Sequence, residues 1–172
     1  NAASGIQVSR SGGDSTQIYY NLFYNTVGGR QTQRTGLQIE GADGLQIYNN
    51  TIHGMGSPTA KVTAGGGIFV ANSGEEISQG SWIYNNIITD CYVDASPLPW
   101  RSIWLRRATN TATIDNNLAS NPYGNDSLWV YREWDVLSTF AQWQALGKDV
   151  NGVHTFAKFT DSTAQNFIPL AG

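Results

Sequence analysis

Short stretches in which apolar and polar residues alternate recur along this chain, and they predict its fold. The segment Gly44–Gly54 reads GLQIYNNTIHG, and three related copies share an isoleucine followed three residues later by an asparagine. The isoleucines are Ile18, Ile47, Ile83 and Ile114, and the asparagines are Asn21, Asn50, Asn86 and Asn117. Successive isoleucines are separated by 29, 36 and 31 residues, so the unit is constant while the connections vary. A unit repeated at such intervals indicates a repeat architecture.

Each copy is preceded by a second pattern, which reads small residue, apolar residue, any residue, apolar residue. Its four examples are Gly5–Val8, Gly36–Ile39, Gly67–Val70 and Ser102–Leu105. A period of two predicts a strand whose alternate side chains point inward, so we expect two short strands per repeat. Asparagine tolerates the left-handed backbone of a sharp corner, and its amide can bond to the asparagine of the next repeat. The sequence therefore predicts stacked coils, which form a solenoid.

The composition agrees with short strands and excludes several classes of function. Only 13% of the 172 residues are charged, and the formal net charge is -3, which gives no electrostatic reason to expect a nucleic acid or a membrane as partner. Cys91 is the single cysteine, so an internal disulfide or a cysteine metal cluster is excluded. No apolar run approaches the length that spans a membrane.

We expect one domain over residues 1–172. The predicted coils are residues 3–29, 36–55, 67–90 and 102–120, and residues 127–172 are expected to form a last strand, a short helix and a cap. The helix is predicted over Ser138–Gly147 with Ser138 as its N-cap, and the long connections before Gly36 and Gly67 are predicted as loops. Because Gly5 already belongs to a strand, we also expect the C-terminal part of a longer solenoid, with self-association through an open N-terminal coil.

The corner Ile-x-Asn-Asn, together with its upstream strand, resembles the coils of the right-handed parallel β-helix superfamily, the pectate lyase-like fold. Residues Phe140–Asp149, Phe156–Asp161 and Phe167 resemble the C-terminal ending of secreted bacterial β-helix repeat proteins. The resemblance implies an all-β, single-stranded right-handed parallel β-helix of about four to five coils with a C-terminal cap. It also implies a secreted or cell-surface bacterial protein.

The same resemblance implies a carbohydrate-active protein that acts on or binds a polysaccharide, as a lyase or a glycoside hydrolase. The alternative is a non-catalytic glycan-binding or structural module, because this fold does not select among activities. The clustered aspartates of polygalacturonases and the Asp-Pro-His signature of alginate epimerases are both missing from the sequence.

Side chains on the outer side of the first strand form the first candidate site. Strand alternation puts Glu40, Trp104 and Arg106 on this side, with Asn72 and Arg107 where the strands end. A lyase acting on an acidic polysaccharide needs a cation to neutralise the sugar carboxylate and a base to remove the adjacent proton. We predict Glu40, Arg106 and Arg107 as catalytic residues, and Asn72 and Trp104 as substrate-binding residues. The alternative is a set of solvated polar residues without a function.

Aromatic side chains on the outer side of the second strand form the second candidate site. The row is Tyr19, Tyr48 and Tyr84, with Trp82 beside it. Rings stacked at coil spacing can bind the apolar faces of sugars, so we predict Tyr48, Tyr84 and Trp82 as substrate-binding residues. The alternative is that the C-terminal segment covers this face through Phe140 or Trp143.

The sequence leaves two further questions undecided, namely whether His53 and Asp90 act as an acid-base pair and whether calcium binds. His53 and Asp90 follow equivalent corners in successive coils, so they form a potential acid-base pair, although a solvated turn histidine is the commoner case. We predict no cofactor. Asp14, Asp43 and Asp90 recur in loops without the dense acidic spacing of a calcium site, so calcium is open but unsupported.

Overall fold

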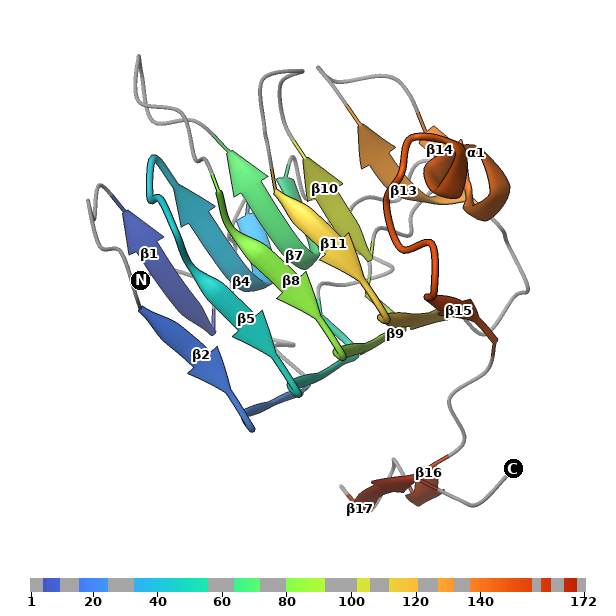
Figure 1. Ribbon diagram of the computed structural model, residues 1–172. Helices are drawn as coiled ribbons and strands as arrows, with labels where there is room; N and C mark the ends of the chain where they lie inside the picture. The colour runs from blue at the N-terminus through green and yellow to red at the C-terminus, as the bar shows by residue number, and fades with distance from the viewer. Residues whose placement is uncertain are drawn as a thin grey trace.

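The fold is a stack of coils made almost entirely of short parallel strands (Figure 1). The computed structural model describes residues 5–9, 16–24, 33–55, 64–71, 80–91, 102–105, 112–120, 127–131, 137–155, 159–161 and 166–169. Three parallel sheets run along the stack, and a complete coil contributes one strand to each of them. Four coils are complete in this sense, and a fifth contributes strands to two of the sheets.

Sheet A contains β1 (Ile6–Ser9), β4 (Gln33–Glu40), β7 (Ala64–Ala71), β10 (Ile103–Leu105) and β13 (Ser127–Tyr131), with β14 (Leu137–Thr139) added antiparallel at its end. Sheet B contains β2 (Gln17–Tyr19), β5 (Gln46–Tyr48), β8 (Trp82–Tyr84) and β11 (Thr113–Asp115). Sheet C contains β3 (Leu22–Tyr24), β6 (Thr51–His53), β9 (Ile87–Thr89), β12 (Leu118–Ser120) and β15 (Val153–His154). A separate antiparallel hairpin, β16 (Phe159–Asp161) and β17 (Asn166–Pro169), follows near the C-terminus (Figure 1).

Each complete coil has three strands, so the prediction of two strands per repeat was wrong. The third strand follows the asparagine corner directly and forms sheet C. Residues Gln33–Thr35 and Ala64–Gly66, predicted as loop, are also strand, since β4 and β7 begin earlier than the small residue of the pattern. Both errors arise because these stretches are too short, or too rich in glycine, to show an alternation of their own.

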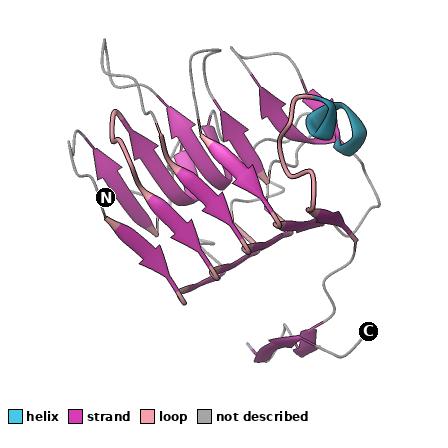
Figure 2. Ribbon diagram, in the orientation of Figure 1, coloured by secondary structure: helices cyan, strands magenta, loops and turns pink. Residues whose placement is uncertain are grey.

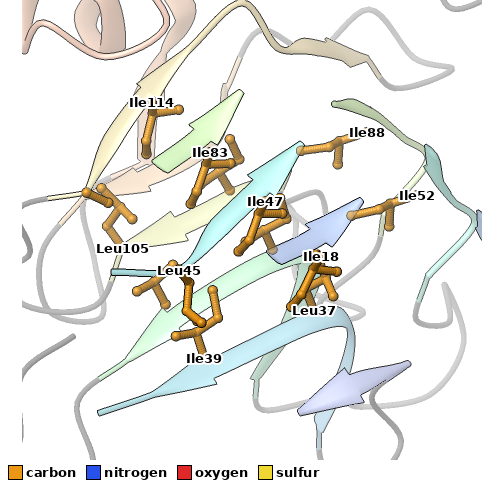
Figure 3. Packing of buried hydrophobic residues seen from close by; sticks show 14 of the residues in the cluster. Ile18, Leu37, Ile39, Leu45, Ile47, Ile52, Ile83, Ile88, Leu105 and Ile114 are labelled. Carbon is orange, nitrogen blue, oxygen red and sulfur yellow. The ribbon is translucent and has the colours of Figure 1, made fainter. Parts of the chain in front are cut away.

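The repeated isoleucines form one buried column, as predicted. Ile18, Ile47, Ile83 and Ile114 are register partners in successive strands of sheet B, and all four are buried. Figure 3 shows them side by side, with Leu37 and Ile39 from sheet A and Ile52 and Ile88 from sheet C facing the same interior. Burial of such a column, repeated coil after coil, is the main apolar stabilisation of a solenoid.

The small residue of the repeated pattern in sheet A is required by packing across the coil. A Cβ at Gly36 would lie 2.6 Å from Ile52 Cγ2 and 2.8 Å from the carbonyl oxygen of Gly67. Those separations are too short for real atoms, so a side chain here would displace sheet C or the neighbouring strand of sheet A. The small position in the repeated pattern therefore marks the closest approach between sheets A and C.

A ladder of side-chain amides runs along the corner between sheets B and C. The Nδ2 group of each asparagine donates to Oδ1 of the next, at 3.0 Å from Asn21 to Asn50, 3.0 Å from Asn50 to Asn86 and 2.9 Å from Asn86 to Asn117. Asn117 donates in turn to Oδ1 of Asp149, at 2.9 Å. The residue before each ladder position has a positive φ, between 54° and 58°, which is the left-handed corner the sequence predicted.

Asp149 ends the ladder because a carboxylate only accepts hydrogen bonds. Its Oδ1 accepts from the backbone and side chain of Asn117, and its Oδ2 accepts from Trp143 Nε1 at 3.3 Å. Burial raises the pKa of this carboxyl, and the hydrogen bonds from Asn117 and Trp143 act in the opposite direction. Trp143 is fully buried in the hydrophobic core, so it covers the end of the apolar column.

The only helix in the described residues, α1 (Phe140–Ala145), packs at the end of the stack opposite the N-terminus (Figure 2). Its N-cap is Thr139 rather than the predicted Ser138, and Thr139 forms a capping box with Gln142. The helix ends before Gly147, whose φ is +72°. No helix in this part of the chain is long and apolar enough to cross a membrane.

Candidate functional site

The outer side of sheet B presents two rows of side chains in register. One row is Gln17, Gln46, Trp82 and Thr113, and the other is Tyr19, Tyr48, Tyr84 and Asp115. Both rows alternate along each strand with the buried isoleucine column, so the outward position predicted for the tyrosines and Trp82 is confirmed. Tyr19 and Trp82 keep 46% and 54% of their surface exposed, so this face meets solvent.

The three tyrosines form a continuous stack. The ring centroids of Tyr19 and Tyr48 are 5.1 Å apart with an interplanar angle of 2°, and those of Tyr48 and Tyr84 are 5.0 Å apart with an angle of 6°. The middle ring, Tyr48, is therefore covered on both faces by its neighbours and turns its edge and hydroxyl outward. Partial desolvation and the neighbouring phenols raise the pKa of Tyr48, and its hydroxyl donates a hydrogen bond to Gln17 Oε1 at 3.0 Å.

The alternative that the C-terminal segment covers this face through Phe140 or Trp143 is wrong. Trp143 lies inside the core at the end of the stack, and Phe140 packs against the same core. The exposed fractions of Tyr19 and Trp82 show that the aromatic face remains accessible.

A pocket opens on sheet B where the tyrosine stack ends. Its volume is about 490 Å³, and its described lining consists of Gln46, Trp82, Tyr84, Thr113, Asp115 and Asn116. Two of these residues are aromatic and the other four carry hydrogen-bonding groups. The volume of the pocket is within the range of small-molecule sites, and its lining offers both aromatic surface and hydrogen-bonding groups.

Asp115 is held in place from the C-terminal cap. The backbone N–H and the side-chain amide of Asn151 both donate to its carboxylate, each at 2.8 Å. Partial desolvation raises the pKa of Asp115, but the hydrogen bonds from Asn151 and from the backbone of Asn116 outweigh it and hold the pKa below its usual value. Sequence reasoning gave Asp115 no role and missed Asn151, because Asn151 lies in the cap, outside the repeated pattern.

The outer side of sheet A, unlike that of sheet B, carries a row of buried side chains. Trp104 has 1% of its surface exposed, so the prediction that it binds substrate was wrong. Its indole packs on Phe69, whose ring centroid is 4.5 Å away, and Phe69 and Gln38 of the same row are buried as well. The parity of the strand was correct, but the outer side of sheet A is a packed layer rather than a solvent-facing surface.

A sequence-family comparison agrees with this architecture. The family model that describes a right-handed β-helix region matches residues 3–139. The chain belongs to this right-handed β-helix family. No match was found among curated proteins or among solved structures, so no named relative assigns the β-helix an activity.

The catalytic cluster predicted on this β-helix is described only at Glu40. Glu40 is half-buried, and its carboxylate accepts a hydrogen bond from Gln38 Nε2 at 2.7 Å and a longer one from Gln7 Nε2 at 3.4 Å. Asn72, Arg106 and Arg107 lie outside the described residues. The contacts of Glu40 with other described residues are thus with neutral amides of its own sheet, and its catalytic role stays a prediction.

His53 and Asp90 do come together on the outer edge of sheet C of the β-helix. His53 Nδ1 lies 3.4 Å from Asp90 Oδ2 and 2.8 Å from the hydroxyl of Thr89, and the imidazole packs edge-on against Phe159 of the C-terminal hairpin. Desolvation lowers the pKa of His53 against the pull of Asp90, and desolvation raises the pKa of Asp90. A partly covered histidine that packs against a residue of the C-terminal hairpin has the character of a packing contact. Among the described residues, no three histidine, cysteine, aspartate or glutamate side chains gather as metal ligands.

Proposed function

We propose that this β-helix binds a polysaccharide on the outer face of sheet B. The observation that carries the proposal is the exposed indole of Trp82, which stands beside a stack of tyrosines that ends at an open pocket. A contiguous exposed apolar patch that is rimmed by polar residues often marks a binding surface. Sugars suit it because one face of a pyranose is lined by C–H groups while its rim carries hydroxyls.

Binding is the function that the described residues support over cleavage. The pocket provides aromatic surface and hydrogen-bonding groups, and binding requires nothing more. Cleavage requires in addition a second carboxylate, or a base with a cation, at the reacting atoms. The residues predicted for that chemistry lie on sheet A or outside the described residues. A non-catalytic glycan-binding module is therefore the better supported of the two expectations.

The test is affinity electrophoresis of the whole chain against a panel of soluble neutral and acidic polysaccharides, followed by calorimetry with those that retard it. Trp82→Ala is expected to weaken binding at least tenfold, because a buried interface tryptophan commonly contributes about 2 kcal/mol or more. Leu22→Ala is the matched control, since Leu22 is 46% exposed on sheet C, away from the pocket. It is expected to bind like the unmodified chain.

Failure of every polysaccharide to bind, or equal binding by both variants, would refute the proposal. The same mixtures are followed by ultraviolet absorbance. A rise from unsaturated products on pectate or alginate would show lyase action and favour the enzymatic alternative instead.

A further inference from the structure

The tyrosine row of sheet B stops one coil before the sheet does. Tyr19, Tyr48 and Tyr84 stack at 5.1 and 5.0 Å, and the next position in register, on β11, is Asp115. Strands in a sheet are spaced by about 4.8 Å, so a fourth ring would fit at the same interval above Asp115. The shorter aspartate side chain leaves that place open, and the pocket of about 490 Å³ lies there. No described ring covers the outward face of Tyr84.

The groups around this gap match the surface of one sugar ring. Trp82 lies on the same strand and the same side as Tyr84, at roughly 6.6 Å along the strand from two residues of rise, so a second aromatic wall flanks the gap. Hydrogen-bonding groups of Gln46, Thr113 and Asn116 line the rest. A pyranose ring has apolar C–H faces and a polar rim, which is the same division between stacking and hydrogen-bonding surface.

The geometry points to a subsite for one uncharged pyranose ring, which takes the fourth place in the stack with a C–H face on Tyr84 and with ring hydroxyls donating to Asp115. This inference rests on the proposed function, and it adds the position of the sugar and its charge class. It differs from the acidic polysaccharide that the sequence suggested from Glu40 and Arg106.

The charge class follows from Asp115. The two hydrogen bonds from Asn151 use part of the capacity of the carboxylate, which has about four acceptor positions, and the rest can accept from sugar hydroxyls. These hydrogen bonds also favour the ionised form. A uronate carboxylate at this place would meet a like charge, and at about 4 Å in water the repulsion amounts to an affinity roughly fivefold lower. Among the described lining residues, Asp115 carries the only formal charge.

The experiment is calorimetry of the whole chain at neutral pH and low salt, with cello-, manno- and xylo-oligosaccharides compared with oligogalacturonate and oligoalginate of matched length. The unmodified chain is expected to prefer the neutral sugars. Asp115→Asn is expected to weaken neutral binding about tenfold, because a charge-assisted hydrogen bond is lost, and to strengthen uronate binding. The ratio of the affinity for neutral oligosaccharides to the affinity for uronates therefore falls. Asp43→Asn removes the same charge at an exposed turn outside the pocket and is expected to leave the ratio unchanged.

The outcomes separate this inference from the proposed function. Tighter binding of the uronates by the unmodified chain would overturn the inference and leave polysaccharide binding standing. Neutral binding that is insensitive to Asp115→Asn, with far-ultraviolet circular dichroism showing an intact fold, would overturn the subsite as well. Absence of binding by every oligosaccharide would count against both, whereas a ratio that falls only in Asp115→Asn supports the subsite.

Discussion

Trp82 and Trp104 occupy outward-facing positions on adjacent coils, and yet one meets solvent while the other does not. Trp82, on sheet B, is 54% exposed, and Trp104, on sheet A, is 1% exposed. Along sheet A the row passes from the exposed Gln7 to the buried Gln38, Phe69 and Trp104. Along sheet B the corresponding row stays at least partly open at every position. The outer side of sheet A is thus a second packed layer, and that of sheet B is a surface.

The difference shows that strand parity and exposure are separate properties. Parity follows from backbone geometry and decides which side of a sheet a residue lies on. Exposure depends on what packs over that side, which parity does not record. The corner between sheets B and C is a single left-handed residue, so it adds no covering chain beside sheet B. An aromatic residue is therefore a binding candidate on sheet B and a packing residue on sheet A.

The largest expected effect comes from truncating the buried tryptophan. Trp104→Ala removes a fully buried indole and its contact with Phe69, so we expect a loss of about 3–5 kcal/mol in the free energy of unfolding. Trp82→Ala removes the same side chain from an exposed position and is expected to change stability by no more than about 0.5 kcal/mol. Urea unfolding followed by circular dichroism measures both. Equal destabilisation by the two variants would contradict the distinction between the sheets.

A smaller loss is expected at Glu40, where the structural and catalytic interpretations diverge. Glu40→Ala takes an acceptor from Gln38, which is buried, and we expect a loss of about 1–3 kcal/mol in the free energy of unfolding. Glu40→Gln keeps an acceptor oxygen and is expected to lose less. If both variants unfold like the unmodified chain while an activity on polysaccharide disappears, Glu40 acts in catalysis rather than in packing.

The parts of the fold that could be predicted are those whose residues recur in successive repeats of the sequence. The isoleucine column, the asparagine ladder and the rows of sheet B each depend on one side chain recurring at one position of the coil, so a single pattern fixes many contacts. The glycine where sheets A and C approach each other closely could be identified from the sequence for the same reason. The tyrosine row could be predicted too. Its stacking with the ring edges outward could not, because ring orientation depends on the neighbouring rings.

The parts that could not be predicted occur once. Asn151 donates a hydrogen bond to Asp115, and Asp149 ends the asparagine ladder beside Trp143. These contacts join the cap to the last coil, and no repeated pattern in the sequence predicts them. Coverage of Trp104 was missed because its row looked outward by alternation alone. The pocket is likewise a departure from repetition, since it exists where a tyrosine row ends in an aspartate.

A moderate effect is expected in the middle of the tyrosine stack, which tests whether the face of sheet B is a preformed platform. Tyr48→Ala removes both ring contacts, so stability should fall, by less than in Trp104→Ala, and sugar affinity should fall as Tyr84 loses its support. Tyr48→Phe keeps the stack and loses only the hydrogen bond to Gln17, so it should bind nearly normally. Chemical denaturation and calorimetry with the same oligosaccharide measure the two effects. Full affinity in Tyr48→Ala would show that the stack does not support the pocket.

The smallest expected effect concerns ionisation, and it contrasts an exposed carboxylate with a buried one. Asn151→Ala removes the side-chain donor to Asp115, so the pKa of Asp115 should rise toward its ordinary value of 3.8. The folded-state pKa of Asp115 is depressed, so its contribution to stability is present above pH 3.8 and is lost as the pH falls through the folded-state pKa. The Asn151→Ala variant should lose this contribution at a higher pH than the unmodified chain. Asp149 has the opposite sign, since burial raises its pKa, so its contribution declines as the pH rises above 3.8. Carboxyl-carbon NMR titration of both residues measures this. A pKa of Asp115 that does not move in Asn151→Ala would mean that the solvent, rather than the cap, sets the charge in the pocket.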